Sequence, residues 1–436
     1  MAFATDIASR FRSDEQIASR IQSVADAHYF AERRVPKGIF QMFEAGSGSN
    51  VTMRENRRAF EEVMFRPRAA VFHRERNLRT TVLGQEISMP VIVSSVGFLS
   101  IGHPDGEAGV ARAAGAAGTI QFLSGVTNTP VEEVIAAASG PVFYQLYYIG
   151  GREASAPIIE RAKEAGAAGL VIIADTATTA RPRERLYHER ASVPAAVSPR
   201  EAIRFAPQVL AKPRWGLEYL RGARRTGSLE PLMAMGLHPD RTPMRFFEAV
   251  GRIYEETPAW EDIPWIRERW DGPLVIKGIL TVEDARRAVA EGADAIVVSN
   301  HGGNVLDGSV PTLPVLPEIV EAVGDEIEVL MDSGVRRGVD VVKALALGAR
   351  AVLLGRAYVY ALLAAGEPGV RHMLELFRQQ IDEALAFLGV ESVHDLDPSY
   401  LELPPSWASA RTVAGRQDRN LEAALAPRAR DNALSS

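Results

Sequence analysis

Short apolar runs rich in valine, isoleucine and leucine recur along the chain, separated by stretches rich in alanine, glutamate and arginine. Runs of this kind predict the buried strands of a parallel sheet, and the intervening stretches predict the helices that cover it. The predicted strands span residues 89–97, 118–125, 142–148, 169–176, 273–279, 295–301, 327–334 and 351–356. The predicted helices between them include residues 106–117, 131–138, 154–165, 282–290 and 340–347.

Eight parallel strands with intervening helices favour a (β/α)₈ TIM barrel, an α/β fold whose catalytic residues gather at the C-terminal ends of the strands. A polar residue or a glycine stands at the end of every predicted strand, namely Ser95, Ser124, Gln145, Asp175, Lys277, His301, Asp332 and Gly355. One polar strand end means little, but eight on one rim predict a functional site there.

The order of these elements divides the chain into regions. Residues 1–60 are predicted to be helices that cap the barrel, and residues 61–400 are predicted to form the barrel. A long insertion after the fourth strand, residues 181–271, is predicted to be an active-site lid, because loops of this length in a compact domain are usually functional. The alternative is a helical surface insertion without a gating role. The tail, residues 407–436, is predicted to be poorly ordered.

Composition narrows the possible functions of this chain of 436 residues. With 49 Lys and Arg against 55 Asp and Glu, the formal net charge is -6. We therefore expect a small-molecule substrate and no nucleic-acid partner. The absence of cysteine excludes disulfides, thiolate metal sites and cysteine nucleophiles. We see no secretory signal and no apolar stretch near the roughly 18 to 20 residues that span a bilayer, and we therefore expect a cytoplasmic protein.

The most informative motif is the glycine-flanked turn that begins at Ser299 and contains His301. Because small neighbours leave space around the imidazole, His301 can meet a substrate and a planar cofactor, which predicts a general base. Asp175 is the best-placed carboxylate to orient this histidine. The alternative is an ordinary loop histidine. The other histidines are scattered along the sequence, so no metal site is predicted.

Lys277 ends the fifth predicted strand and is expected to point a cation into the barrel mouth, where it needs a partner. A cofactor that becomes anionic on reduction, such as a flavin, is one such partner. A structural salt bridge to Asp332 or Asp175 is the alternative.

Two further segments predict a phosphate site. Gly334 and Arg336 follow the seventh predicted strand, and Gly355 and Arg356 end the eighth. Barrels commonly bind phosphate with the loops after these two strands, through amide N–H groups and arginine. The alternative is that these residues are helix caps and solvated arginines.

Together these motifs resemble the FMN-dependent α-hydroxy acid oxidase and dehydrogenase family, which includes glycolate oxidase and lactate oxidase. The resemblance runs from about residue 31 to residue 403. Its most specific segments are residues 53–57, 80–84, 103–107, 145–147, 276–278, 299–303, 332–338 and 354–356.

The resemblance implies an FMN cofactor and a role for each site residue. His301 would be the base that removes a proton from the substrate, with Asp175 supporting the imidazolium, and Tyr147 would contact the substrate or the flavin edge. The residues implied around the isoalloxazine are Ser124, Gln145, Lys277 and Ser299. Those implied near the ribityl chain and phosphate are Asp332, Gly334, Arg336, Gly355 and Arg356. The resemblance also implies a homo-oligomer, a tetramer in the family, and leaves the electron acceptor unidentified.

The chain departs from the family pattern where the substrate would be held. Asn304 stands where members that act on α-hydroxy acids carry an arginine for the substrate carboxylate, and Met42 aligns with a substrate-binding tyrosine. A second family arginine corresponds to Arg181 or Arg183. The motif around Asn304 is similar to the mycofactocin-associated branch of the family, whose members oxidise a peptide-derived lactam amine to an α-keto amide.

The leading functional hypothesis is an FMN-dependent oxidoreductase that acts on a CH–OH or CH–NH₂ carbon beside a carbonyl, with His301 as the base. One alternative is the mycofactocin-type oxidation of a lactam amine. Another is an ordinary α-hydroxy acid oxidase that binds the carboxylate through Arg181 or Arg183 alone. A third is a flavin-binding scaffold without catalysis. The presence of both His301 and Asp175 argues against this alternative.

Overall fold

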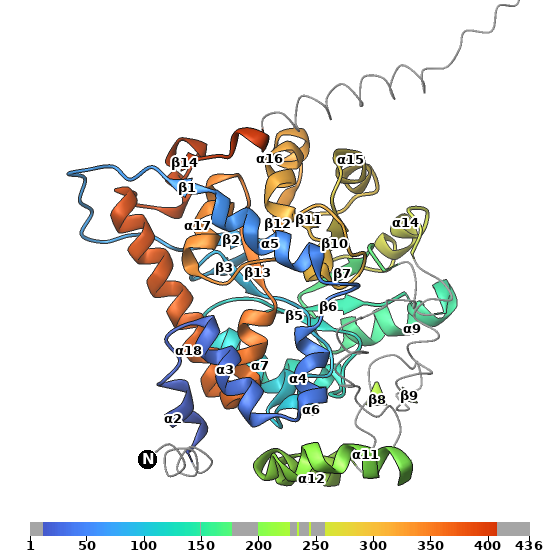
Figure 1. The fold of residues 1–436 in the computed structure, drawn as a ribbon. Helices are drawn as coiled ribbons and strands as arrows, with labels where there is room; N and C mark the ends of the chain where they lie inside the picture. Colours follow the sequence, from blue (N-terminus) through green and yellow to red (C-terminus); the bar gives the residue numbers. More distant parts are fainter. Residues whose placement is uncertain are drawn as a thin grey trace, which may run out of the picture.

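A closed barrel of eight parallel strands lies at the centre of the protein (Figure 1). The computed structural model describes residues 12–148, 150–176, 199–226, 233–234, 244–245 and 258–407. In order around the barrel the strands are β4 (Val91–Val93), β5 (Gln121–Ser124), β6 (Val142–Leu146), β7 (Gly169–Ile173), β10 (Leu274–Ile279), β11 (Ala295–Val298), β12 (Glu328–Met331) and β13 (Ala351–Leu354). Each predicted strand contributes one of these, so the predicted (β/α)₈ fold is confirmed.

Several strands end earlier than the sequence predicted. β11 stops at Val298, although the prediction ran to residue 301, and β4 stops at Val93, although the prediction ran to residue 97. His301 and Phe98 adopt left-handed backbone conformations, with φ of 57° and 58°, which an extended strand cannot contain. The chain therefore leaves the sheet at the rim, where the predicted site lies.

The interior of the barrel is a separate apolar cluster. Phe122 and Phe143 stack there at 5.4 Å between ring centroids. The hairpin formed by β2 (Thr80–Val82) and β3 (Gln85–Ile87) adds Val82 and Ile87 to this cluster and closes the N-terminal end of the barrel. Because side chains fill the half of the barrel at its N-terminal end, ligands are restricted to the C-terminal end.

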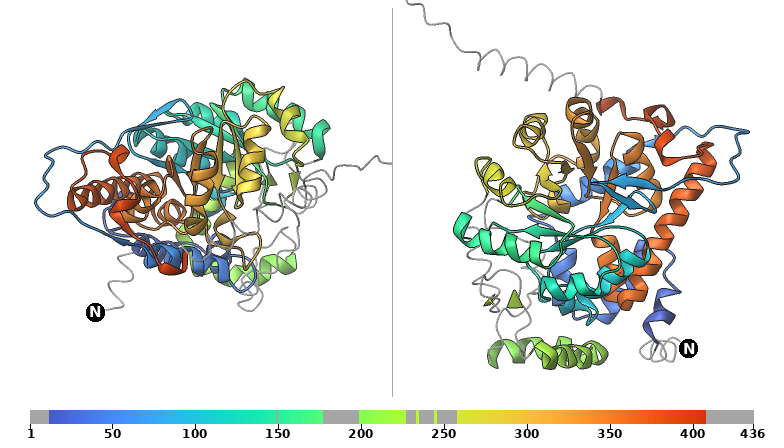
Figure 2. Two further views of the ribbon diagram at one scale, coloured as in Figure 1. Left: turned by 90° about the horizontal axis from the view of Figure 1, so that it is seen from above. Right: turned by 180° about the vertical axis from the view of Figure 1, so that it is seen from behind.

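Helices surround the barrel (Figure 2). The sequence shows why they begin where they do: the Thr281 hydroxyl accepts a hydrogen bond of 3.1 Å from the Asp284 N–H and so caps the helix that follows β10. The surrounding helices are α7 (Gly106–Ala116), α8 (Val131–Ala137), α9 (Gly151–Glu164), α14 (Asp262–Arg267), α15 (Val282–Ala290), α16 (Thr312–Val323), α17 (Gly338–Ala346) and α18 (Arg356–Leu388).

Both ends of the described chain pack against the barrel. The N-terminal helices are α2 (Asp14–Ala18), α3 (Val24–Arg34), α4 (Lys37–Glu44) and α5 (Val51–Glu62), of which α2 and α3 contact α18. β1 (Met64–Phe65) pairs antiparallel with β14 (Leu401–Glu402), which follows two 3₁₀ turns, η2 (Val393–Asp395) and η3 (Pro398–Tyr400). Residues 408–436 of the predicted tail lie outside the described residues.

Part of the predicted insertion is helical. α11 (Pro199–Leu210) and α12 (Pro213–Thr226) follow one another in the chain, and two short strands, β8 (Met233–Ala234) and β9 (Met244–Arg245), pair beyond them. Buried Trp215 fixes α12 to the body of the protein, because its indole N–H donates a hydrogen bond of 2.9 Å to the carbonyl of Ile101 in α6 (Leu99–Gly102). None of the helices described here is long and apolar enough to cross a bilayer.

The contact between Gly169 and the Phe143 ring gives a test of the barrel core. A Cβ added at Gly169 would lie 2.0 Å from a ring atom of Phe143, which is fully buried against Phe122. We expect Gly169→Ala to lower the free energy of unfolding by about 1–3 kcal/mol, measured by chemical denaturation. Gly222→Ala in α12 is the control, because no atom lies within 4 Å of its added Cβ, and this variant should be at least as stable as the wild type. Equal stability of the two variants would contradict the packing described here.

Candidate active site

Along the barrel strands, toward their C-terminal ends, the inward-facing side chains change from apolar to polar within two residues. The apolar layer contains Ile92, Phe122, Phe143, Val171, Val275, Val297, Leu330 and Leu353. Because side chains alternate along a strand, the residue two positions later also faces inward. These later residues are Ser94, Ser124, Gln145, Ile173, Lys277, Ser299, Asp332 and Gly355. All except Ile173 are polar or glycine, and the sequence had predicted six of them around a cofactor.

Lys277 lies in the middle of this polar layer and is buried. Its Nζ lies 3.0 Å from a carboxylate oxygen of Asp332 and donates a hydrogen bond of 2.8 Å to the Ser299 hydroxyl. Of the two carboxylates considered from the sequence, the ammonium pairs with Asp332. Because its ammonium is fixed by these two partners, Lys277 can stabilise negative charge that develops on a group above it.

His301 and Asp175 face one another above the polar layer. The Nδ1 of His301 lies 3.1 and 3.2 Å from the two carboxylate oxygens of Asp175, and both side chains are largely buried. Gly278 makes room for this pair, because a Cβ at that position would lie 2.6 Å from the Cβ of Asp175. With Nδ1 engaged by the carboxylate, Nε2 of His301 is the atom available to exchange a proton.

The turn that carries His301 is an unusual backbone structure. In the 3₁₀ turn η1 (His301–Gly303) three successive residues have positive φ, of 57°, 63° and 75°. A non-glycine residue in this region is strained, so the conformation must be imposed by its surroundings. Side-chain oxygens accept a hydrogen bond from each N–H of the turn: Ser299 from His301, Ser333 from Gly302 and Asn300 from Gly303, at 3.0, 3.0 and 3.2 Å.

The three carbonyls of η1 are engaged as well. The N–H of Asn304 donates to the carbonyl of His301 at 3.1 Å, and the Ser47 N–H donates to that of Gly303 at 2.8 Å. Arg356 donates a hydrogen bond of 2.8 Å to the carbonyl of Gly302, and its guanidinium also donates to the carbonyls of Phe43 and Ala45. The turn is thereby joined to the N-terminal segment and to the start of α18.

A reciprocal amide pair connects α5 to the same turn. Each side-chain amide of Asn56 and Asn300 donates to the other's oxygen at 2.8 Å, and both residues are buried. Nearby, the carboxylate of Asp307 accepts the N–H groups of Ser49 and Thr52 at the start of α5. Sequence reasoning assigned no role to Asn56, Ser333 or Ser47, because these contacts join segments that are far apart in the chain.

Positive charge is concentrated at the predicted phosphate site. Burial is the main cause of a lowered pKa of Arg336, and the neighbouring charges of Arg356 and Arg57 lower it further. A Cβ added at Gly355 would meet no other atom within 4 Å, so open space borders the backbone there. Neighbouring cations beside open space, of which Arg336 and Arg356 are partly buried, fit a bound anion such as a phosphate group.

The remaining predicted residues have the following positions. Ser124 accepts a hydrogen bond of 3.2 Å from the Val126 N–H, and Gln145 is buried and hydrogen bonded to Ser95, which the sequence had placed on the rim. Gly334 lies against Asn56, where an added Cβ would be 2.5 Å from the Asn56 carbonyl oxygen. Tyr147, Met42 and Asn304 are partly buried. Arg181 and Arg183 lie outside the described residues.

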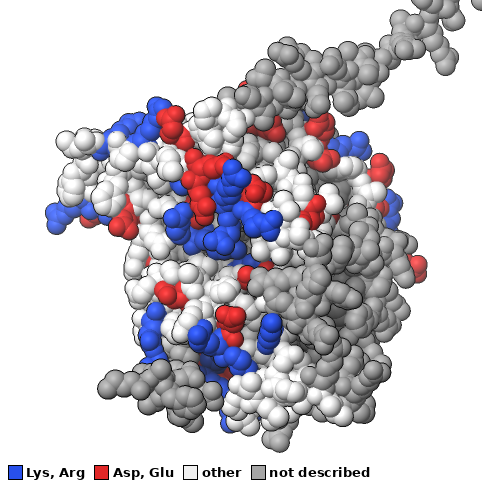
Figure 3. Space-filling view, in the orientation of Figure 1, with Lys and Arg blue, Asp and Glu red and all other residues white. Residues whose placement is uncertain are grey.

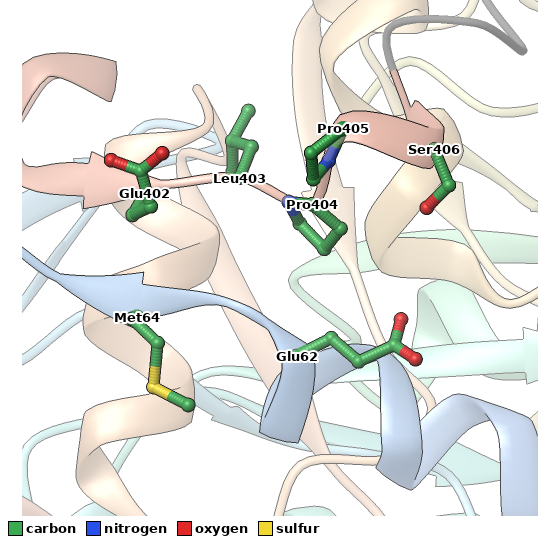
Figure 4. Close-up of a pocket in the computed structure, with 7 residues that line it drawn as sticks. All are labelled: Glu62, Met64, Glu402, Leu403, Pro404, Pro405 and Ser406. Atoms are coloured by element: carbon green, nitrogen blue, oxygen red, sulfur yellow. The ribbon is translucent and has the colours of Figure 1, made fainter.

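A surface pocket lies away from this site, where β1 pairs with β14 (Figure 4). It is lined by Glu62, Met64, Glu402, Leu403, Pro404, Pro405 and Ser406. None of these residues belongs to the polar layer or to η1. Within the described part of the chain, no group of three or more His, Asp or Glu side chains is arranged to hold a metal ion.

The fold and the site define a barrel oxidoreductase with a His–Asp pair, a buried lysine and a cluster of arginines at the end of the barrel. The chain matches the model of the FMN-dependent dehydrogenase family over residues 31–403 and belongs to this family. It is an FMN-dependent oxidoreductase of the α-hydroxy acid dehydrogenase type. The polar layer, the space beside Gly355 and the charge around Arg336 fit FMN, which Lys277 and Arg336 would help to hold.

Two curated relatives illustrate the range of the family. Pre-mycofactocin synthase of Mycobacterium tuberculosis (strain CDC 1551 / Oshkosh) is 42% identical over 398 residues, which cover 91% of this chain and 98% of that protein. L-lactate dehydrogenase of Caulobacter sp. (strain K31) is 38% identical over 384 residues, which cover 87% of this chain and 98% of that protein. Relatives that differ in their named substrates thus share almost their whole length with this chain.

Solved structures of mandelate dehydrogenase and mandelate oxidase are also similar to this chain. (S)-Mandelate dehydrogenase, described as a monotopic membrane protein, superposes with a TM-score of 0.79 at 34% identity and covers 88% of this chain and 100% of its own. An arginine-to-leucine variant of mandelate oxidase, solved with 2-hydroxy-phenylacetamide, has a TM-score of 0.71 at 33% identity and covers 88% of this chain and 98% of its own.

The amide pair of Asn56 and Asn300 can be tested by substitution. Asn56→Ala leaves the buried Asn300 amide with fewer partners, and we expect the free energy of unfolding to fall by about 1–3 kcal/mol. Arg58→Ala on the exposed face of the same helix removes only surface ion pairs with Glu55 and Glu62 and should change stability by about 0.5 kcal/mol or less. Chemical denaturation of both variants gives the comparison, and equal losses would contradict the anchoring role of Asn56.

Proposed function

We propose that this enzyme oxidises a carbon that carries an amine and lies beside a neutral amide carbonyl, as in a lactam. The observation that carries the proposal is Asn304, whose N–H is bonded to the carbonyl of His301. Asn304 therefore directly follows the turn that holds the proposed base, at the position where the family resemblance implies a carboxylate-binding arginine. An asparagine amide can both donate to and accept from a neutral amide, but it brings no charge to balance a carboxylate.

The roles of the chain's own residues follow from the contacts of the site. FMN, when bound, supplies the acceptor for two electrons from the substrate carbon. His301 takes the proton at Nε2, because Asp175 engages Nδ1 and stabilises the imidazolium that results. Lys277, held by Asp332 and Ser299, places a fixed positive charge in the polar layer below.

The overall reaction balances as follows. The carbon that carries the amine loses its C–H proton and two electrons, which FMN would accept when bound. The amine nitrogen loses a second proton, and the C–N bond becomes a C=N bond. Water then adds to the imine carbon and ammonia leaves, which yields the ketone beside the amide carbonyl. His301 is placed to accept one of the two protons.

Two comparisons support the substrate class. The mycobacterial relative that shares 42% identity is named pre-mycofactocin synthase, and the family resemblance links that branch to oxidation of a lactam amine. The mandelate oxidase variant that lacks one arginine was solved with 2-hydroxy-phenylacetamide, a neutral amide. A protein of this fold is therefore compatible with an uncharged ligand.

A second candidate is oxidation of an α-hydroxy acid, favoured by the likeness to L-lactate dehydrogenase and (S)-mandelate dehydrogenase. In this case Arg181 or Arg183 would bind the carboxylate without help from position 304. A charge-assisted hydrogen bond contributes roughly 1.5–3 kcal/mol, so loss of a bidentate arginine weakens carboxylate binding by about tenfold or more. That cost makes the neutral substrate the better candidate.

The direct test is anaerobic reduction of the purified holoenzyme. A neutral α-amino lactam and a set of small α-hydroxy acids, such as lactate, glycolate and mandelate, are added separately while the visible absorbance of the flavin is followed. We expect the lactam to bleach the flavin and the acids to leave it oxidised. Bleaching by the acids alone would establish the second candidate, and a protein that retains no FMN would contradict the cofactor assignment.

Asn304→Arg should shift the substrate preference from the lactam to α-hydroxy acids. We expect mandelate or lactate to bind this variant about tenfold or more tightly than the wild type, because the guanidinium can form a bidentate pair with the carboxylate, and we expect lactam oxidation to slow. Asn304→Gln, which keeps an amide, is the matched control and should retain the preference for the lactam. The affinities come from titration of the oxidised flavin and the rates from stopped-flow reduction. An Arg variant with unchanged affinity for the acids would argue against this role of position 304.

Asp175→Asn tests the proton transfer. An amide cannot neutralise the imidazolium, so we expect the rate of flavin reduction to fall by about 100-fold or more while the flavin content stays the same. Asp382→Asn, which breaks an ion pair with Arg76 away from the site, is the control and should reduce its flavin at the wild-type rate. A normal rate in Asp175→Asn would show that the pair is structural.

A further inference from the structure

The side chain of Arg356 connects parts of the active-site end that are far apart in the sequence. Arg356 begins α18, and its guanidinium donates hydrogen bonds to the carbonyls of Gly302, Phe43 and Ala45, at 2.8, 3.1 and 3.4 Å. Gly302 belongs to η1 and directly follows His301, whereas Phe43 and Ala45 lie at the C-terminal end of α4. One guanidinium thus holds both the turn of the proposed base and the end of an N-terminal helix.

The glycine at position 302 allows the guanidinium to come this close. A Cβ added to Gly302 would lie 2.9 Å from the Nη1 of Arg356. The N–H of Gly302 is held as well, by the hydroxyl of Ser333, which itself donates a hydrogen bond of 2.7 Å to Asp332. Because His301 has a positive φ and is strained, the turn keeps its conformation only while such contacts hold it.

The contacts to the turn and to α4 leave part of the Arg356 guanidinium for another partner. An arginine carries five N–H donors in one rigid plane. The three carbonyl contacts use one donor on each of its nitrogens, and within the described part of the chain the other two donors bond to no acceptor. Open space borders the backbone of the neighbouring Gly355. A cation with donors to spare beside open space suits an anion.

Other arginines add to the positive charge at this end of the barrel. Burial lowers the pKa of Arg336, and the charges of Arg356 and Arg57 lower it further. Arg57 lies on α5 together with Arg54 and Arg58, and all three are exposed. Figure 3 shows Lys and Arg side chains, beside several acidic ones, gathered over α5 in the middle of the view. Because like charges repel one another, a bound anion stabilises this group of arginines.

We propose that Arg356 is a positioning residue that couples the occupied anion site to the turn that holds His301. Because the guanidinium is planar and rigid, an anion that fixes two of its donors also fixes the donors that hold Gly302 and the end of α4. α4 contains Met42, so the same coupling reaches a residue that the family resemblance implies at the substrate.

The coupling is reciprocal, because a turn held in place also holds Arg356 ready for the anion and tightens anion binding. The anion considered is the phosphate group of FMN, which this end of the barrel fits. The effect on the reaction rests on the role of His301 as the base in the proposed function. It does not depend on whether the substrate is a lactam or an α-hydroxy acid.

The experiment is hydrogen–deuterium exchange of the FMN-saturated enzyme, measured in peptides that cover residues 43–47 and 299–304. Arg356→Lys keeps a positive charge for the phosphate, but an ammonium cannot hold three carbonyls in one rigid plane. We expect both segments to exchange about tenfold or more faster in this variant than in the wild type. Flavin reduction should also slow by about tenfold or more, because the base is less well placed.

Two further arginines give matched controls. Arg336→Lys changes the other predicted phosphate ligand, whose side chain donates to the carbonyl of Val335 instead of to η1, so both segments should exchange as in the wild type at saturating FMN. Arg337→Lys changes an exposed arginine that pairs with Asp340 and should reduce its flavin at the wild-type rate.

Inorganic phosphate separates this coupling from direct cover of the turn by the cofactor. Added to the FMN-free full chain, whose folding is checked by circular dichroism, phosphate should slow the exchange of residues 299–304 in the wild type but not in Arg356→Lys. Protection that appears only with the whole of FMN would overturn the coupling, because the cofactor would then cover the turn itself.

Gly302→Ala acts on the same contact from the other side and serves if Arg356→Lys does not fold. Its Cβ crowds the Nη1 of Arg356, so residues 43–47 should exchange faster and FMN should bind about tenfold more weakly, although neither α4 nor an arginine is altered. Wild-type exchange of both segments in folded Arg356→Lys, or of residues 43–47 in folded Gly302→Ala, would show that the parts are not coupled. Faster exchange with an unchanged rate of flavin reduction would show that Arg356 does not position the base.

Discussion

The alternation of side chains along the eight parallel strands is the constraint on which the rest of the structure depends. The same inward-facing positions supply an apolar floor, with Phe122 and Phe143 stacked, and two residues later a polar layer with Lys277 and Asp332. A strand shifted by one residue would turn its polar residue outward and place an apolar one at the rim. Barrel stability and site geometry are therefore set by one register, and the chain cannot alter one without the other.

The turn η1, which carries His301, must be held from outside the sheet because β11 ends before it. β11 ends at Val298, and η1 then takes three left-handed residues, of which His301 is strained because it has a Cβ. Every backbone N–H and carbonyl of η1 has a partner, and those partners come from the residues on either side of η1, the loop after β12, the start of α18 and the N-terminal segment. The conformation of one turn thus depends on elements from both ends of the barrel sequence.

The sequence predicted the parts of this arrangement that are local. Strand ends can be read from apolar runs, so Ser124, Gln145, Lys277, Ser299, Asp332 and Gly355 were predicted at one rim, and the alternation of side chains places all six in one layer. The pairing of His301 with Asp175 was also expected, because Asp175 was the carboxylate nearest to the rim. The amide pair of Asn56 with Asn300 could not be predicted in the same way, since it joins residues separated by 244 positions and no local pattern distinguishes Asn56 from a surface asparagine.

The ends of several strands were predicted too far along the chain for a related physical reason. Residues 94–97 after β4 are apolar or small, and Ser299 after β11 is small, so hydrophobicity does not mark where these strands stop. The backbone then turns at Phe98 and at His301. The partners that impose those turns belong to other elements. Asn304 shows the other limit: its identity was visible in the sequence, but its position directly after η1 follows only from the structure. Because the surrounding scaffold is fixed by the barrel register, the proposed function requires only that this one side chain change the charge that the site accepts, while His301 and Asp175 stay in place.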